Sequence, residues 1–311
     1  MRDFVGKNIL VNVWNYSFNI LLNIKKAYLT LVDNCVIKVV RPPYVSTIDQ
    51  TIEKIIKEKC SVSRYGDGEL KLIAGRDISF QKHSSLLEQR LKELLVSNED
   101  NHIVCIPDIF KDNTQYTKTY AKAWKDHLIY FRLKWYKNLR MQKKYYNAFI
   151  SRCYLCYQDQ SKSKYFFNNL KKIWNNRDIV LVEGEFSRLG VGNDLFDNAN
   201  SIRRILCPKR DAFSIYKSIL EYLKTFKKDT LILIALGPSA TVLSYDLYKE
   251  GFQAIDIGHI DVEYEWYLKG ATKKEPVKNK FVNEVNGGVF EEELINKKYY
   301  DQILINLNTI S

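Results

Sequence analysis

Short runs of consecutive apolar residues alternate with stretches of helical periodicity over most of this chain. Runs of this kind are typical of parallel strands that are buried on both faces of a sheet. The alternation predicts an α/β fold: a Rossmann-like, mostly parallel sheet with helices on both faces. Strands are expected at 62–65, 103–106, 179–182, 202–207, 231–236 and 254–257, and helices at 47–59, 86–96, 212–225 and 240–249.

The first 41 residues differ from this pattern. Their apolar side chains recur at helical spacing until Pro42-Pro43, which marks a boundary. Lys25 and Lys26 interrupt the segment, so it contains no apolar run long enough to span a bilayer. We expect a helical extension that packs either on the body of the protein or on a partner subunit. In the second case the protein would be a homo-oligomer. The alternative is a helix lying on an anionic membrane surface.

The remainder divides into three parts. Residues 47–285 are predicted to form the main domain. Within it, residues 112–176 are rich in Tyr, Trp, Lys and Asn and are expected to form a helical insertion. Residues 286–311 are expected to be a C-terminal tail or helix.

Composition narrows the possible partners. The chain has 311 residues, a net charge of +12 and a pI of about 9.2, which favours polyanionic partners. Acidic residues are interspersed among the lysines, so no nucleic-acid-binding arm is predicted. Cys153 and Cys156 form a lone Cys-x-x-Cys pair, and no second pair completes a zinc site. Because the N-terminus lacks a signal-peptide pattern, we expect a cytoplasmic location. If residues 1–41 contact a membrane, this would be its inner face.

The segment from Arg64 to Glu69 carries the first candidate chemistry. Asp67 and Glu69 are two residues apart, directly after a predicted strand, and Gly66 and Gly68 stand on either side of Asp67. An Asp-x-Glu pair can hold a divalent metal, which in turn can hold a diphosphate. The other interpretation is a surface turn, because Asp-Gly is a common turn dipeptide.

A second polar segment follows the strand predicted at 179–182. Its glycines, Gly190 and Gly192, match a dinucleotide-binding loop poorly, because Leu195 stands where the third glycine belongs. Arg188 is suited to a phosphate, and Asn193 and Asp194 to hydroxyls or to capping a helix. In parallel sheets, ligands bind beyond the carboxyl ends of the strands, where this segment is predicted to lie.

Two further segments follow the last two predicted strands. Gly237-Pro238-Ser239 begins a predicted helix, whose N-terminus is an anion site or simply a capped helix end. Near His259, the acidic residues Asp261, Glu263 and Glu265 alternate. In an extended chain all three share a face, whereas in a helix Asp261 and Glu265 meet. One of them, or His259, is a candidate general base, although a lone histidine is often structural.

Together these segments resemble the GT-D class of bacterial glycosyltransferases, once classed as a domain of unknown function. The resemblance covers residues 47–285 and rests on four blocks in the same order, at 64–69, 182–196, 236–247 and 256–266. It implies a uridine diphosphate (UDP) sugar as donor, glucose as the sugar, and Mn²⁺ or Mg²⁺ held by Asp67 and Glu69. It implies an acceptor that is a surface glycan, a glycoprotein or a lipid-linked oligosaccharide.

Charge builds on the leaving diphosphate during such a transfer, so a metal ion and arginines would stabilise it. Asp261, Glu263 and His259 are the candidate catalytic residues, and 112–176 the candidate acceptor region. A nucleotide-sugar-binding module without turnover is the alternative function. The candidate donor-binding residues are Arg64, Gly66, Asp67, Glu69, Glu183, Arg188, Gly190, Gly192, Asn193, Asp194, Gly237, Pro238, Ser239 and Thr241.

Overall fold

The computed structural model describes residues 2–285 and 294–309, with side chains from residue 14 onward except residue 17. Within this part of the chain, nine strands form one sheet in the order β1-β4-β3-β2-β8-β7-β5-β6-β9, and every neighbouring pair is parallel. The predicted α/β class and parallel sheet are confirmed. The strands are β1 (Tyr44–Val45), β2 (Ser61–Arg64), β3 (His102–Ile106), β4 (Lys144–Asn147), β5 (Asp178–Gly184), β6 (Ser201–Cys207), β7 (Leu231–Ala235), β8 (Gln253–Asp256) and β9 (Ile303–Asn306).

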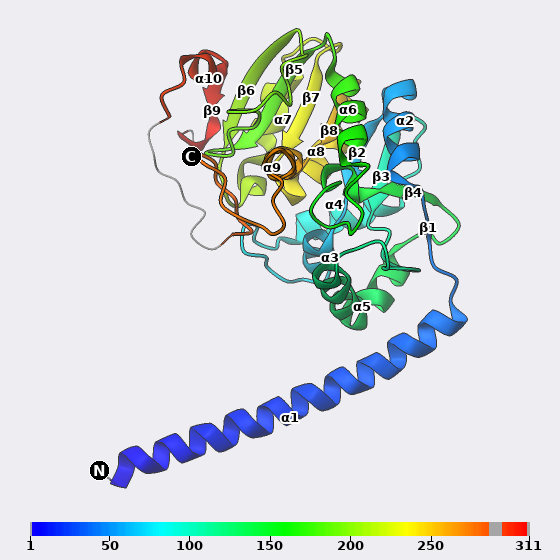
Figure 1. Ribbon diagram of the computed structural model, residues 1–311, viewed down its shortest axis with the longest axis vertical. Helices are drawn as coiled ribbons and strands as arrows, with labels where there is room; N and C mark the ends of the chain where they lie inside the picture. Colours follow the sequence, from blue (N-terminus) through cyan, green and yellow to red (C-terminus); the bar gives the residue numbers. More distant parts are fainter. Residues whose placement is uncertain (1, 286–293, 310–311) are drawn as a thin grey trace.

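Helices cover both faces of this sheet (Figure 1). Alternate residues of β5 point to opposite faces: Ile179 and Leu181 join one apolar core, and Val180 and Val182 join the other. The first core includes α2 and α6, and the second includes α7 and most of the buried face of α8. The helices are α1 (Arg2–Val39), α2 (Ile48–Glu58), α3 (Asp67–Ile73), α4 (Ser85–Val96), α5 (Lys118–Asn138), α6 (Ser163–Trp174), α7 (Tyr216–Lys224), α8 (Pro238–Lys249), α9 (Ile260–Lys269) and α10 (Lys297–Asp301).

Two of the predicted segments need correction. The stretch 112–176 is not wholly helical, because it contributes β4, which lies inside the sheet between β1 and β3. Its residues, Lys144–Asn147, alternate exposed or half-buried with buried positions and so lack a continuous apolar run. The C-terminal segment is more than a tail or helix, since β9 pairs with β6 and forms one edge of the sheet.

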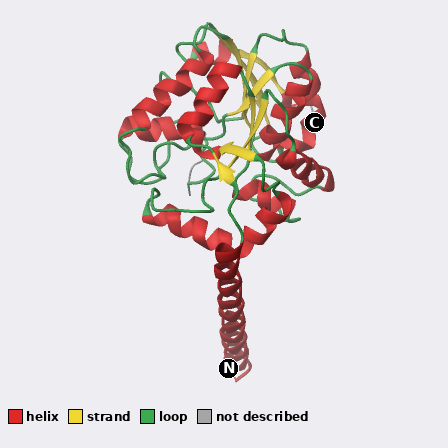
Figure 2. Cartoon of the chain, turned by 90° about the vertical axis from the view of Figure 1, so that its right-hand side faces the viewer, coloured by secondary structure: helices red, strands yellow, loops and turns green. Residues whose placement is uncertain are grey.

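The N-terminal extension is the long helix α1, as predicted, and it projects from the body (Figures 1 and 2). Its C-terminal half packs on α5. Lys26 Nζ lies 2.8 Å from Asp126 Oδ1, and the buried Asp33 carboxylate pairs with Arg132 at 2.5 Å. Among the described residues, no helix has the length and apolar character needed to cross a membrane.

Candidate functional site

A cleft of about 760 Å³ lies at the carboxyl ends of β2, β7 and β8. The loops that follow these strands line it, together with α3, one face of α5 and the segment 274–284. This is the position that the parallel topology predicts for a ligand. The residues of this cleft that matter below are Arg64, Gly66, Asp67, Glu69, Lys71, Tyr120, Trp124, His127, Arg152, Lys209, Arg210, Gly237, Asp256, His259, Lys274 and Glu284.

The Asp-x-Glu pair lies in the first turn of helix α3, at its N-terminus. Glu69 is at the third helical position and accepts a hydrogen bond from the Gly66 backbone N–H at 2.7 Å, which caps the helix. Burial raises the pKa of Glu69 to about 7. Asp67 is about half exposed, and the ammonium of Lys71 lies 2.6 Å from it, one turn along the helix. Both residues line the same cleft.

Arg64 ties two strand ends together rather than reaching freely for a ligand. Its guanidinium donates to the Asp256 backbone oxygen and carboxylate at 2.8 and 2.6 Å, and to Ser151 Oγ at 2.6 Å. Gly258 makes room for it: the residue has φ +43°, and a Cβ there would lie 1.9 Å from the guanidinium. Arg64 therefore holds the floor of the cleft between β2 and β8.

A cluster of charged residues forms the opposite wall. Glu284 pairs with Arg152 and lies 2.6 Å from Lys274 Nζ and 3.4 Å from His259 Nε2. Although burial alone would raise it, the positive charges of Arg152 and Lys274 hold the pKa of Glu284 well below its usual range. Burial lowers the pKa of His259 to about 4, and the Arg152 charge acts in the same direction. His259 is therefore a neutral imidazole near pH 7 and is able to accept a proton.

Aromatic side chains from α5 form a third wall. Tyr120, Trp124 and His127 line the cleft, and Trp124 packs edge-on against both His127 and Phe149. These residues belong to the stretch predicted as the acceptor region. Flat aromatic faces beside polar groups suit a sugar, whose ring has apolar faces and polar edges.

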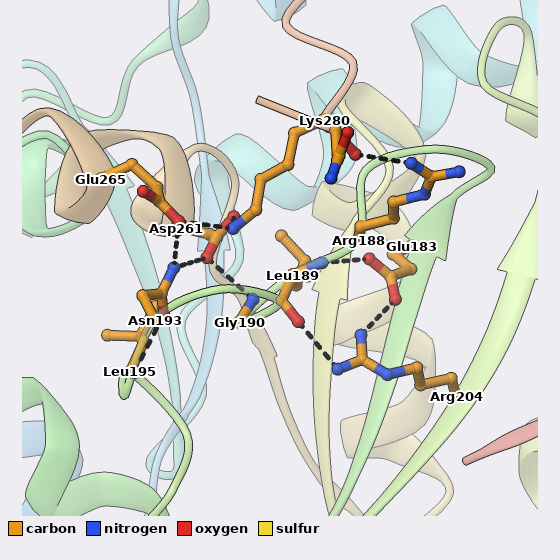
Figure 3. Close-up of polar contacts among 11 residues, drawn as sticks. Glu183, Arg188, Leu189, Gly190, Asn193, Leu195, Arg204, Asp261, Glu265 and Lys280 are labelled. Carbon is orange, nitrogen blue, oxygen red and sulfur yellow. Dashed lines mark hydrogen bonds and ion pairs between the residues drawn. The ribbon is translucent and has the colours of Figure 1, made fainter. Parts of the chain in front are cut away.

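The acidic residues of α9 lie elsewhere. The segment is helical, so Asp261 and Glu265 share a face, and Lys280 inserts between them with its Nζ 2.7 and 3.0 Å from their carboxylates (Figure 3). Asn193 donates to both carboxylates, and the Gly190 N–H donates to Asp261. Asp261 is fully buried and outside the cleft, so this geometry does not support it as the catalytic base.

Glu263 is also fully buried and absent from the cleft lining. It accepts from the Leu155 backbone N–H at 3.1 Å, and Arg152 lies 4.0 Å away. Burial raises the pKa of Glu263 to about 7. Of the three candidate catalytic residues, only His259 lines the cleft, because it stands at the N-terminal cap of α9, whereas Asp261 and Glu263 lie within the helix and are fully buried.

The loop after β5 is fixed by a second buried network, also drawn in Figure 3. Glu183 pairs with Arg204 at 2.6 Å and accepts from the Leu189 N–H at 2.7 Å. Arg188 is buried, and its guanidinium donates to the Asn279 backbone oxygen at 2.9 Å, so it is not positioned for phosphate. Gly190 has φ +72°, where a Cβ would lie 2.6 Å from the Phe196 ring.

A separate cavity of about 330 Å³ adjoins this loop and includes Gly190, Gly192, Asn193 and Asp194 in its lining. The four residues, predicted for the donor, therefore line a different cavity from the Asp-x-Glu pair. Asp194 pairs with Lys171 and accepts from Tyr264. Asn193 and the Gly190 N–H instead bind Asp261, the carboxylate that also holds Lys280.

The start of α8 contributes little side-chain chemistry. Gly237 lines the cleft, but Pro238, Ser239 and Thr241 are buried, and Thr241 donates to the Arg64 backbone oxygen at 2.9 Å. Cys153 and Cys156 are also buried, and burial raises the pKa of both thiols well above its ordinary value, which disfavours the reactive thiolate.

Several cleft residues had no sequence signal of their own. Lys209 and Arg210 follow β6, and Lys274 and Glu284 come from the segment after α9. Isolated lysines and glutamates in a Lys-rich chain look like surface residues. Only the packing of this segment against the strand ends brings them to the site.

The Asp-x-Glu pair fits a hard divalent cation. Both residues offer carboxylate oxygen, and both line one cleft beside basic residues suited to a diphosphate. Among the described residues, no three His, Cys, Asp or Glu side chains are grouped to hold a metal ion. A cation at Asp67 and Glu69 would therefore take its remaining ligands from diphosphate and water, as Mg²⁺ commonly does.

The family described as "Glycosyltransferase GT-D fold" matches residues 62–285. The chain belongs to this family. Curated relatives include glycosyltransferase GlyD of Streptococcus pneumoniae, 39% identical over 264 residues, and the probable glycosyl transferase Gly of Streptococcus gordonii, 40% identical. Both matches cover 85% of this chain but only 32% and 39% of the relatives, so the chain spans roughly a third of their length.

Solved structures show the same fold. A glycosyltransferase of the DUF1792 group from Streptococcus sanguinis superposes with a TM-score of 0.82 at 40% identity, covering 85% of this chain and 99% of that one. A DUF1792 domain reported to have a distinct glycosyltransferase fold gives a TM-score of 0.84 at 38% identity, covering 88% and 99%. The expected resemblance to the GT-D class is thus confirmed.

Proposed function

We propose that this protein transfers a sugar, glucose, from a UDP-sugar to a hydroxyl group of a glycan, glycoprotein or lipid-linked oligosaccharide. The observation that carries the proposal is the shared cleft: the Asp67 and Glu69 carboxylates line it together with Lys209, Arg210 and Arg152. This is a site with oxygen ligands for a cation and positive charge for a diphosphate.

Asp67 and Glu69 would hold Mn²⁺ or Mg²⁺, which when bound offsets the negative charge that develops on the leaving diphosphate. Lys209 and Arg210, both exposed at the end of β6, would contribute to binding the diphosphate through charge-assisted hydrogen bonds. Arg64 keeps the strand ends at fixed spacing through its bonds to Asp256 and Ser151.

His259 is the residue best placed to take the proton from the acceptor hydroxyl. Its imidazole lines the cleft and is unprotonated at pH 7, because burial lowers its pKa to about 4. That low pKa also makes it a weak base, so the imidazolium would need a nearby negative charge. Glu284, 3.4 Å from Nε2, would stabilise the imidazolium that forms. Trp124 and Tyr120 provide the surface on which the acceptor sugar would lie.

Calorimetric titration of UDP into the full chain, with and without Mn²⁺, tests the proposal. We expect Mn²⁺-dependent binding that is lost in Asp67→Asn and retained in Asp197→Asn, an exposed carboxylate away from this cleft. Absence of UDP binding by folded wild type contradicts the donor assignment. Binding without transfer from any UDP-hexose to any glycan tested favours the module without turnover.

A further inference from the structure

Helix α1 presents an apolar face that no described part of the chain covers. Along the half that packs on α5, Asp33 is buried, whereas Tyr28 and Leu31 are 65% and 66% exposed. Residues three and four apart lie on one side of a helix, so Leu21 and Ile24, also exposed, continue this face. We call Leu21, Ile24, Tyr28 and Leu31 the outer face of α1, because it points away from the body.

The exposed apolar surface extends beyond this face. Trp14 is 72% exposed and lies seven residues before Leu21, so it continues the outer face by two turns. Phe18 and Ile20 are 52% and 42% exposed and flank this face on either side. Pairing with a second copy through a two-stranded seam would cover about two positions in seven. Such a dimer would cover the outer face but leave Phe18 and Ile20 outside the seam. A lipid surface, into which a helix sinks by part of its width, covers a wider arc.

Charge identifies the kind of lipid surface. Between residues 4 and 32 the chain has no Asp or Glu and carries Lys7, Lys25 and Lys26, within a protein of net charge +12. Two such helices side by side repel each other, whereas an anionic lipid surface attracts them. Trp14, Tyr16 and Tyr28 are the residue types that favour the boundary between headgroups and acyl chains.

We propose that α1 lies on an anionic membrane surface, with its outer face at the boundary between headgroups and acyl chains. The proposal does not depend on the transferase activity. It has a consequence for the position of the cleft, because α5 contacts α1 through Asp126 and Arg132 and lines the cleft with Trp124 and His127. One helix width therefore separates the docked helix from the cleft wall.

The test is co-sedimentation of the full chain with vesicles of phosphatidylcholine, with or without about one-third phosphatidylglycerol. We expect binding to the anionic vesicles that weakens as salt is raised. The variant Leu21→Asn/Ile24→Asn is expected to partition about tenfold less or lower still, since two apolar side chains leave the lipid. The matched control is Leu86→Asn/Leu268→Asn, which changes two exposed leucines on α4 and α9 and is expected to bind like the wild type.

Light scattering after gel filtration of the same samples tests the alternative, in which a second copy of the chain covers α1. Wild type that stays in the supernatant with anionic vesicles overturns the proposal, and so does wild type that pairs through α1 without binding vesicles. Equal binding to neutral vesicles overturns the anionic assignment, and equal binding by the Leu21→Asn/Ile24→Asn variant shows that α1 is not the docking surface. Circular dichroism and an unchanged melting temperature confirm that each variant is folded.

Discussion

Two acidic segments of this protein look alike in sequence and differ in structure. Asp67 and Glu69 stand at the N-terminus of α3 and line an open cleft, with one exposed lysine beside them. Asp261 and Glu265 stand on α9, buried against Lys280. The role of a pair of carboxylates therefore depends on its surroundings. Solvent access suits Asp67 and Glu69 to bind a ligand. Asp261 and Glu265 instead form buried ion pairs with Lys280 that stabilise the fold.

Removing the counter-charge should have the largest effect on stability. Lys280→Met leaves Asp261 and Glu265 buried without their cation, so we expect a loss of about 3–5 kcal/mol in the free energy of unfolding. Urea denaturation measures it. The matched change at the cleft, Lys71→Met, should cost at most about 1 kcal/mol, because its ion pair with Asp67 is exposed. Equal losses of unfolding free energy in Lys280→Met and Lys71→Met would contradict the distinction between a buried and an exposed ion pair.

Neutralising one aspartate in each segment separates ligand binding from bracing. Asp67→Asn should lower kcat/KM about a hundredfold or more, with a melting temperature close to that of the wild type. Asp261→Asn should instead lower the melting temperature, because Lys280 loses one of its two ionised partners. Measuring both kcat/KM and the melting temperature for each variant distinguishes a role in ligand binding from a role in stability. The opposite pattern, an unfolded Asp67→Asn and an inactive but stable Asp261→Asn, would reverse the assignment.

Glu263 predicts a pH dependence of stability. Its pKa of about 7 in the folded state exceeds the ordinary 4.5, so between about pH 4.5 and 7 the folded protein holds more protons at this site than the unfolded chain. The contribution of this group to stability is therefore present at low pH and is lost as pH rises through 7. Glu263→Gln should flatten the dependence by about 1–3 kcal/mol across the window.

Denaturation of wild type and Glu263→Gln at pH 5, 6, 7 and 8 measures this difference. His259 acts with the opposite sign, because its lowered pKa makes stability rise with pH between about 4 and 6.5. Because His259 is present in both proteins, its contribution cancels when the unfolding free energy of Glu263→Gln is subtracted from that of the wild type at each pH. What remains is the contribution of Glu263. Parallel curves for the two proteins would show that Glu263 does not titrate in this range.

The smallest expected effect concerns the aromatic wall. Trp124→Ala removes a partly buried ring that lines the cleft, so we expect the KM for the acceptor to rise about three- to tenfold. The KM for the donor should stay unchanged. Steady-state kinetics with each substrate varied in turn distinguish the two. The control is Tyr130→Ala, which removes an exposed aromatic side chain of the same helix outside the cleft lining. A matching rise in donor KM would place Trp124 against the donor instead.

The sequence by itself determined the α/β class, because uninterrupted apolar runs such as 179–182 suit only strands covered on both faces. It also determined that Asp67 and Glu69 follow a strand, at the edge where ligands bind. Local patterns did not reveal β4, because a strand of mixed polarity is stabilised by its neighbours in the sheet rather than by its own residues. They did not reveal β9 either, because its apolar run is only three residues long and its place in the sheet comes from pairing with β6.

Only the tertiary structure decided which charged groups reach solvent. His259 and Glu263 are one helical turn apart, yet His259 lines the cleft and Glu263 is buried beside Leu155. Lys280, distant in sequence from Asn193, meets the same two carboxylates and removes them from the chemistry of the site. Burial and pairing of charges are set by contacts between remote segments, whereas periodicity records only which side of its own element a residue occupies.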